Sequence, residues 1–229
     1  MTTIGVLGAG QAGSTLARAS IAAGYDVVIA NSRGPESLRG LVSELGPRAR
    51  AASAWDAAAA ADFAIAAFPY APADRLPVEE LAEKVVLDTN NYMAWRDGHL
   101  AEVDSGRKTV HELRQEQLPS SMVVKAFTHI QFHERSPVRV PSDLLPGVFR
   151  LARPAGAPDR KALVVSSDYP DAVELVTRLY DDLGFDAVDN SPLSESWRSA
   201  PGSPMWRHHV DGQSRDELIR NLVLAERLT

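Results

Sequence analysis

Three glycines near the start of the chain, Gly8, Gly10 and Gly13, constrain its fold more than any other feature. They follow a short apolar run at 3–7 and precede a small-residue stretch at 14–23. In a GxGxxG loop between a strand and a helix, the first glycine forms a tight turn, the second approaches a pyrophosphate, and the third packs the helix on the strand. The helix N-terminus favours the anion. We therefore expect a dinucleotide at this loop, although a glycine-rich turn without a ligand is the alternative. The predicted contacts are Gly8, Ala9, Gly10, Gln11, Ala12 and Gly13.

The end of the second apolar run, 26–30, indicates which dinucleotide binds. NAD-binding units usually carry a carboxylate there for the ribose 2′-hydroxyl, about 20 residues after the glycine loop. This chain has Asn31, Ser32 and Arg33, with no carboxylate between Asp26 and Glu36. A guanidinium beside amide and hydroxyl donors suits a 2′-phosphate. We predict that residues 31–33 select NADP(H); the alternative for Arg33 is a solvated side chain at a turn.

Composition narrows the class of protein. The chain has 229 residues, no cysteine and a formal net charge of −6. An acidic chain is atypical of nucleic-acid-binding proteins, and a chain without cysteine has no disulfide or thiolate chemistry. It shows neither an apolar run of about 18 residues nor a basic, apolar leader. We expect a soluble, cytoplasmic protein that binds a small molecule, with no nucleic-acid or membrane partner.

Apolar runs alternate with helix-like segments along the chain, a pattern typical of a parallel sheet covered by helices. We expect an α/β fold: a Rossmann-type, doubly wound, mostly parallel sheet with a smaller C-terminal α/β portion. Expected strands lie at 3–7, 26–30, 49–52, 62–68, 84–88, 121–127, 161–165 and 185–188, and expected helices at 14–23, 36–45, 53–61, 76–82, 171–183 and 216–228. A proline- and charge-rich loop at 136–146 suggests an NADP-binding domain, 1–150, followed by a substrate-cleft and dimerisation portion, 151–229.

Five segments together resemble the NADPH-dependent coenzyme F420 reductases, NADP oxidoreductases that exchange a hydride with a deazaflavin. They are IGVLGAG at 4–10, NSR at 31–33, DTNNY at 88–92, VVKAF at 123–127 and GFDAVDNSPLSESWR at 184–198. The first two are shared with many NADP enzymes, and the last three in this order are more specific. The resemblance extends over most of residues 1–205.

The resemblance implies a set of residues around the reacting ring, and a homodimer. Strand-end residues would lie at the nicotinamide: Phe68, Pro69, Tyr70, Asn90 and Thr128. A second group would contact the second substrate: Asn91, Tyr92, Ser196 and Arg198. Judged from the residues alone, the two asparagines could equally form a turn after the strand, and Arg198 could equally pair with a nearby acid.

The chain departs from the family pattern after Phe127, where Asn-Thr is common and this chain continues THIQFH at 128–133. A carbonyl or imine acceptor needs a proton donor, whereas hydride transfer to a deazaflavin requires no side-chain acid. His129 is the candidate catalytic donor, with Tyr70 or Tyr92 behind it. The alternative for His129 is a structural histidine bonded to the backbone, and His133 is expected at the surface.

The segment after Pro204, MWRHH at 205–209, also departs from the family pattern. Its histidines and Asp211 match no metal-site spacing, so we expect no metal. The lead hypothesis is hydride transfer between NADP(H) and coenzyme F420. The alternatives are an NADPH-dependent reductase of a small carbonyl or imine substrate, and a non-catalytic NADP-binding redox sensor.

Overall fold

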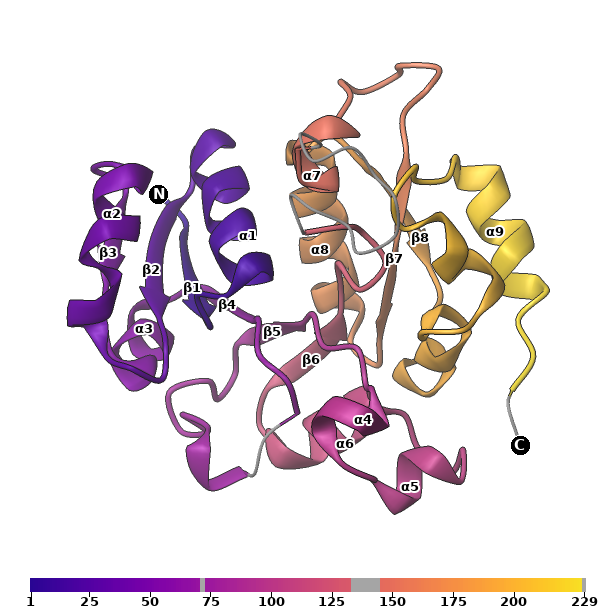
Figure 1. Ribbon diagram of the computed structural model, residues 1–229, viewed down its shortest axis with the longest axis horizontal. Helices are drawn as coiled ribbons and strands as arrows, with labels where there is room; N and C mark the ends of the chain where they lie inside the picture. Colours follow the sequence, from indigo (N-terminus) through magenta and orange to yellow (C-terminus); the bar gives the residue numbers. More distant parts are fainter. Residues whose placement is uncertain (71–72, 133–144, 228–229) are drawn as a thin grey trace.

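One continuous sheet organises the computed structural model, which describes residues 1–70, 73–132 and 145–227. The strand order is β3-β2-β1-β4-β5-β6-β7-β8, and every neighbouring pair is parallel except β6 and β7. Figure 1 shows the sheet crossing the molecule from β3 on the left to β8 on the right. The expected Rossmann-type α/β fold is confirmed. The strands are β1 Thr3–Leu7, β2 Asp26–Ala30, β3 Ala49–Ala51, β4 Phe63–Ala66, β5 Val85–Asp88, β6 Met122–Lys125, β7 Ala162–Ser167 and β8 Asp186–Asp189.

Helices connect these strands and cover both faces of the sheet. The α-helices are α1 Gln11–Ala22, α2 Arg39–Leu45, α3 Ala54–Ala60, α4 Ala94–Asp97, α5 Ala101–Asp104, α6 Val110–Gln117, α7 Gly147–Arg150, α8 Pro170–Asp182 and α9 Arg215–Val223. Short 3-10 helices lie at Pro35–Leu38, Ala73–Arg75, Leu193–Ser199 and Pro204–His208. Capping boxes, in which Thr109 pairs with Glu112 and Ser214 with Glu217, fix the starts of α6 and α9.

Alternating side chains of each strand pack into separate apolar layers on the two faces of the sheet. In β1, Ile4 and Val6 enter the layer beneath α1, whereas Leu7 enters the opposite layer with residues of α3. In β7, Leu163 and Val165 pack toward α8, and Ala162 and Val164 pack with Leu218 and Leu222 of α9. Because successive strand residues point to opposite faces, both faces of the sheet are buried.

The sheet continues across the expected domain boundary. β6 pairs with β7 through Val124↔Ser167 and Lys125↔Ser166, and the Ser167 hydroxyl donates to the Val123 carbonyl at 2.7 Å. The two portions therefore share one sheet, and their division near residue 150 stays a prediction. Most of the loop expected at 136–146 lies outside the described residues, as does His133.

The helix expected at 76–82 is wrong. The segment forms turns, in which the N–H of Val78 bonds the Leu76 carbonyl and the N–H of Ala82 bonds the Glu79 carbonyl. Pro77 supplies no N–H, and the buried side chains of Leu76 and Leu81 tie the segment to the core more strongly than helix propensity does. The terminal helix is also shorter than expected and ends at Val223.

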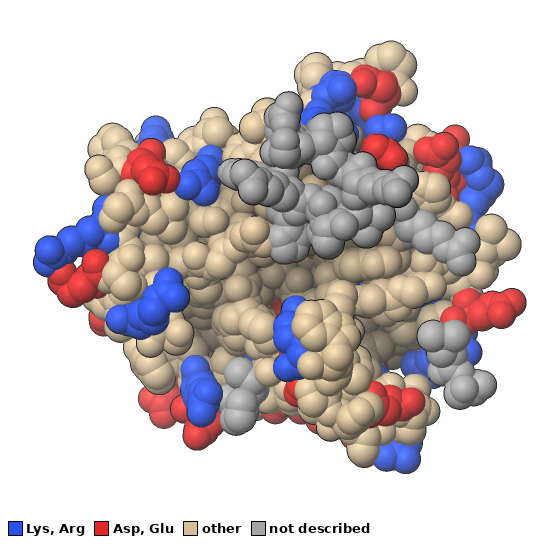
Figure 2. All heavy atoms as spheres, in the orientation of Figure 1, with Lys and Arg blue, Asp and Glu red and all other residues tan. Residues whose placement is uncertain are grey.

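Charged side chains of both signs lie mainly around the rim of the described face in Figure 2, with uncharged residues between them. None of the helices in the described part of the chain has the length and apolar character needed to span a bilayer.

Candidate active site

The glycine loop joins β1 to α1 with no room for side chains at two of its three glycines. Gly8 has a φ of 110°, and a Cβ there would lie 2.3 Å from the Ala67 carbonyl oxygen. A Cβ on Gly13 would lie 1.9 Å from the Gly8 carbonyl oxygen. By contrast, a Cβ on Gly10 would have no neighbour within 4 Å, and Gly10 caps α1 without a side-chain hydrogen bond. The open space at Gly10 therefore adjoins the free N–H groups of the helix start, which suit an anion.

The end of β2 lies beside this loop, because the Gly8 N–H bonds the Ala30 carbonyl at 2.9 Å. Asn31 shapes the turn that follows: its Oδ1 accepts from the Arg33 N–H at 2.9 Å, and its Nδ2 donates to the Ser37 hydroxyl at 2.9 Å. The side chains of Ser32 and Arg33 are exposed. Asn31 thus serves the turn, and Ser32 and Arg33 remain available to a 2′-phosphate.

A cleft of about 380 Å³ opens at the carboxyl ends of β4, β5 and β6, and we name it the cofactor cleft. Parallel α/β sheets bind ligands at this edge. Six of the residues predicted for the dinucleotide or the substrate line it: Ala12, Phe68, Pro69, Asn90, Asn91 and Thr128. The structure adds lining residues that were not predicted as site residues: Met93, Arg96, Ile130, Gln131, Phe132, Trp206 and His209. They come from loops, from the short helix α4 and from the C-terminal portion, so only the folding of the chain brings them to the cleft.

Polar atoms without a protein partner lie beside the cofactor cleft. Asn91 Nδ2 donates to the Thr128 carbonyl at 2.7 Å and ties the ends of β5 and β6 together, but its buried Oδ1 has no partner. Arg96 donates to Asn90 Oδ1 at 3.0 Å, and the buried Nδ2 of Asn90 and Oγ1 of Thr128 are also unpartnered. Buried polar groups normally find hydrogen bonds, so these atoms fit the amide and hydroxyl groups of a bound nicotinamide riboside.

A buried ionic cluster supports both sides of the cofactor cleft. Asp88 accepts from the Asn90 N–H at 3.2 Å, from His111 Nδ1 at 3.1 Å, and lies 3.7 Å from Arg114 Nε. Burial alone would raise the pKa of Asp88, but the charge of Arg114 and the hydrogen bond from His111 lower it. The Arg114 guanidinium also lies over the ring of Phe68, 5.0 Å from its centroid, and over the ring of Tyr70, 5.2 Å away. The cluster therefore links the Asn90 side of the cleft to residues 68–70.

Thr128 reaches the cleft through an unusual backbone turn. Phe127 has a φ of 56°, a left-handed conformation that non-glycine residues rarely adopt. Tyr180 holds it: its hydroxyl accepts from the Phe127 N–H and donates to the Val164 carbonyl, both at 2.9 Å, and its ring meets the Phe127 ring edge-on at 4.8 Å. Strain of this kind persists only where the surroundings over-determine the backbone.

The expected catalytic role of His129 is not supported by its position. The side chain is buried, does not line the cofactor cleft, and its Nε2 accepts from the Val164 N–H at 2.9 Å. Burial and the nearby positive charge of Lys125 lower the pKa of His129 to about 3. A neutral imidazole whose Nε2 bonds the backbone cannot supply a proton to the cleft, so the structural alternative fits better.

The residues expected at the second substrate separate in the structure. Asn91 lines the cofactor cleft and, with Tyr92 and Ser196, a neighbouring cavity. Arg198 lines neither; it pairs with Glu195 at 2.7 Å and lies over the Trp197 ring, as the alternative reading of Arg198 expected. In the described residues, no group of three or more His, Asp or Glu side chains could hold a metal ion.

A Rossmann-type sheet with a glycine loop and a cleft at its carboxyl edge is typical of dinucleotide-binding proteins, and comparison with known proteins shows which family this part of the chain is similar to. Residues 3–92 match the family of NADP oxidoreductases described as coenzyme F420-dependent. The match covers less than half of the chain and agrees with the resemblance seen in the sequence to the NADP oxidoreductases. It covers the glycine loop, residues 31–33 and the end of β5.

Three individual proteins are similar to this chain in sequence or in fold. The curated protein YjhV of Escherichia coli (strain K12) is 40% identical over 53 residues, which cover 23% of this chain and 39% of YjhV. Hypothetical protein SMa0349 of Sinorhizobium meliloti is similar in structure with 28% identity and a TM-score of 0.67, over 90% of this chain and 93% of that one. A "putative f420 dependent nadp-reductase" of Arthrobacter sp. FB24 shares the fold with 24% identity and a TM-score of 0.68, over 86% and 87% of the two chains.

Proposed function

We propose that this protein transfers a hydride between NADP(H) and a deazaflavin of the coenzyme F420 type. The observation that carries the proposal is the match of residues 3–92 to the F420-dependent NADP oxidoreductases, combined with a cleft at the carboxyl edge of that same sheet. Bound NADPH supplies the hydride, and the protein supplies position and electrostatics. The expected homodimer stays a prediction.

The glycine loop, the turn after β2 and the cofactor cleft each have a role in this proposal. The N-terminus of α1 at Gly10 binds the pyrophosphate, and Arg33 pairs with the 2′-phosphate. Asn91 Oδ1 and Thr128 Oγ1, both unpartnered, orient the nicotinamide amide and ribose. Pro69 lies at the edge of the cleft and restricts water near the ring. Because a deazaflavin accepts the hydride without a side-chain acid, the buried, neutral His129 is compatible with this chemistry.

The direct test is anaerobic mixing of the protein with NADPH and oxidised coenzyme F420 while the visible absorbance of the deazaflavin is followed. We expect bleaching that depends on both NADPH and the protein. Gly10→Ala, which crowds the predicted pyrophosphate position, should slow bleaching at subsaturating NADPH. Saturable NADPH binding without any bleaching would refute the deazaflavin acceptor while leaving the NADP site intact.

A second candidate, reduction of a small carbonyl or imine, is favoured by one residue in the cofactor cleft. His209 lines the cleft, stacks on Trp206 at 5.5 Å, and its Nδ1 lies 2.9 Å from the Trp206 carbonyl. In that hydrogen bond Nδ1 keeps its proton and donates to the carbonyl oxygen, so Nε2 is the ring nitrogen that can exchange a proton with a substrate. His209 therefore replaces His129 as the candidate donor.

Paired variants distinguish the two candidates. His209→Ala should abolish turnover of a carbonyl or imine substrate and leave deazaflavin bleaching nearly unchanged. The neighbouring His208, which is exposed and does not line the cleft, provides the matched control His208→Ala. Equal turnover in both variants would remove His209 from the chemistry.

A further inference from the structure

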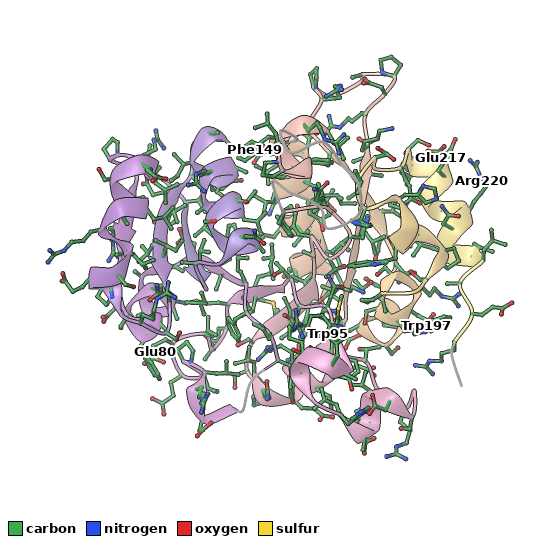
Figure 3. All side chains as sticks on the ribbon, viewed as in Figure 1. Glu80, Trp95, Phe149, Trp197, Glu217 and Arg220 are labelled. Atoms are coloured by element: carbon green, nitrogen blue, oxygen red, sulfur yellow. The ribbon has the colours of Figure 1, made fainter. Side chains whose placement is uncertain are left out.

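A second cavity of about 380 Å³ lies behind the residues that line the cofactor cleft. Asn90 and Asn91 line both spaces, so a short segment after β5 separates them. The second cavity lies between the α5–α6 region, residues 196–204 and the chain that follows α9. Figure 3 shows Trp197, one of its wall residues, on the C-terminal side of the molecule. Asn91, Tyr92 and Ser196, which the resemblance implied for the second substrate, line this cavity, but the roles proposed above for hydride transfer are assigned to residues outside it or shared with the cofactor cleft.

Lys125 gives the second cavity a buried amine that is positively charged when protonated. Its side chain is 1% exposed, lines the cavity, and its Nζ donates to the Ser196 carbonyl at 2.7 Å. Within the described part of the chain, Lys125 forms no ion pair. The carboxylate that acts on it electrostatically, Asp88, is already bonded by His111 and lies beside the buried Arg114.

When Lys125 is protonated, a charge count around it leaves an excess of one positive charge. Lys125 and Arg114 are cations, Asp88 is the single buried anion of the group, and burial lowers the pKa of His111 and keeps its imidazole neutral. An unpaired buried charge is costly, so the ammonium form of Lys125 is favoured only when an anion from outside the protein lies beside it.

Unused hydroxyl groups and an apolar wall indicate what kind of anion fits. The Ser196 side chain is 1% exposed and its Oγ has no hydrogen-bond partner; the buried Oγ of Ser203 has none either. Much of the remaining wall is apolar, including Val110 and Trp197. Hydroxyls beside a lysine suit a carboxylate, and the apolar wall suits a hydrocarbon body.

We propose that the second cavity is a binding site for a small organic monocarboxylate. The carboxylate pairs with Lys125 Nζ and accepts a hydrogen bond from Ser196 Oγ, and the apolar body packs against Trp197 and Val110. The other charged groups on the cavity wall are Lys108, which pairs with Glu116, and Glu226 and Arg227 near the C-terminus. The site uses a cavity distinct from the cofactor cleft and does not depend on the identity of the hydride acceptor.

Binding of a carboxylate here is coupled to proton uptake. Burial lowers the pKa of Lys125 to about 7, although Asp88 opposes the shift, so at pH 8 most of the empty protein has a neutral Lys125. An anion at Nζ stabilises the ammonium form and raises its pKa again. Of the other groups that line the cavity, His111 is buried, which lowers its pKa and favours the neutral imidazole, and Glu226 is exposed. Lys125 is therefore the group that takes up the proton.

The test is calorimetric titration at pH 8 of the full chain with acetate, isobutyrate and benzoate, with benzamide as the uncharged control. A pH indicator in weakly buffered solution records proton uptake in parallel. We expect at least one carboxylate to bind saturably with uptake of up to one proton, and benzamide to bind at least tenfold more weakly. Lys125→Met should weaken the carboxylate roughly tenfold or more and abolish the proton uptake.

Two further variants keep the test decisive. Ser196→Ala retains the charge and should weaken binding several-fold, while Lys108→Met, which changes a rim cation, should stay within about twofold of wild type. NADPH affinity and thermal unfolding measured in each variant show whether the fold and the cofactor cleft are intact. Absence of saturable binding by all three carboxylates, equal affinity for benzamide, or unchanged affinity in a folded Lys125→Met variant would overturn the proposal.

Discussion

The buried Lys125 makes a specific prediction about how the stability of this protein depends on pH. Its pKa falls from an ordinary value of 10.5 to about 7 because burial penalises the ammonium form. The folded-state pKa is thus below the unfolded-state value, and between pH 7 and 10.5 the unfolded chain binds more protons than the folded chain. Stability must therefore rise with pH through this window, and the full penalty applies below pH 7.

The size of the effect follows from the same pKa. One pKa unit corresponds to about 1.4 kcal/mol, so the fall to about 7 corresponds to about 5 kcal/mol of lost stability at acidic pH. According to the linkage relation, the free energy of unfolding should rise by about 2.5 kcal/mol between pH 6 and pH 9 as Lys125 loses its proton. Lys125→Met removes the titrating group and keeps a side chain of similar length. Relative to wild type, this variant should gain stability at pH 6 and lose that advantage progressively toward pH 9.

The assay is thermal unfolding of both proteins at several pH values from 6 to 9. For a chain of this length, about 2.5 kcal/mol corresponds to a change of roughly 5–10 °C in the Tm difference between the two proteins. Lys108→Met is the control: Lys108 pairs with Glu116, which raises the pKa of the lysine, so its contribution is lost only above pH 10.5, outside the measured window. Parallel pH profiles for wild type and Lys125→Met would show that Lys125 does not titrate near neutrality in the fold.

Three further predictions concern the cofactor cleft. Gly10→Ala should leave Tm nearly unchanged but weaken NADPH binding at least tenfold. Gly13→Ala should lower Tm sharply, because its Cβ would lie 1.9 Å from a carbonyl oxygen. Equal Tm values for the two variants would contradict this difference. Arg33→Ala should raise the Kd of NADPH roughly 10- to 100-fold and that of NADH less than about twofold, because a charge-assisted hydrogen bond contributes about 1.5–3 kcal/mol. Fluorescence titration measures both Kd values, and equal weakening of the two cofactors would refute the specificity role of Arg33. Tyr180→Phe removes the hydroxyl that accepts from the Phe127 N–H, so it should lower the free energy of unfolding by about 1–3 kcal/mol and weaken NADPH binding through the displaced turn. Denaturant unfolding and cofactor titration measure the two effects. Wild-type values in both would disprove this role of Tyr180.

The glycine pattern predicted the loop between β1 and α1 well because it depends on local chain geometry. A GxGxxG loop between a strand and a helix forms wherever those elements form, so the placement of Gly8, Gly10 and Gly13 followed from the sequence. Asn91 and Thr128 were also foreseen, because residues at the ends of adjacent parallel strands meet at one edge of the sheet.

Residues from distant segments were harder to foresee. Arg96 and His209 reach the cofactor cleft from a short helix after β5 and from the C-terminal portion. Neither was predicted as a site residue, although His209 lies in the segment 205–209 that departs from the family pattern. His129 failed as a proton donor for the opposite reason: its position next to Thr128 suggested the cleft, but the turn at Phe127 directs it toward β7. Sequence neighbours at such a turn need not share a surface.

The sequence by itself determined the parallel α/β architecture, the glycine loop and the absence of a carboxylate after β2, because strand periodicity, glycine sterics and local charge act over a few residues. Tertiary structure alone decided the protonation and the partners of the buried groups. Lys125, Asp88, His111 and Arg114 are ordinary ionisable residues in the sequence. Burial and their mutual distances make them a cluster in which protonation of Lys125 leaves an unbalanced positive charge. Burial is a property of the assembled fold, since it depends on which distant segments exclude water from each side chain.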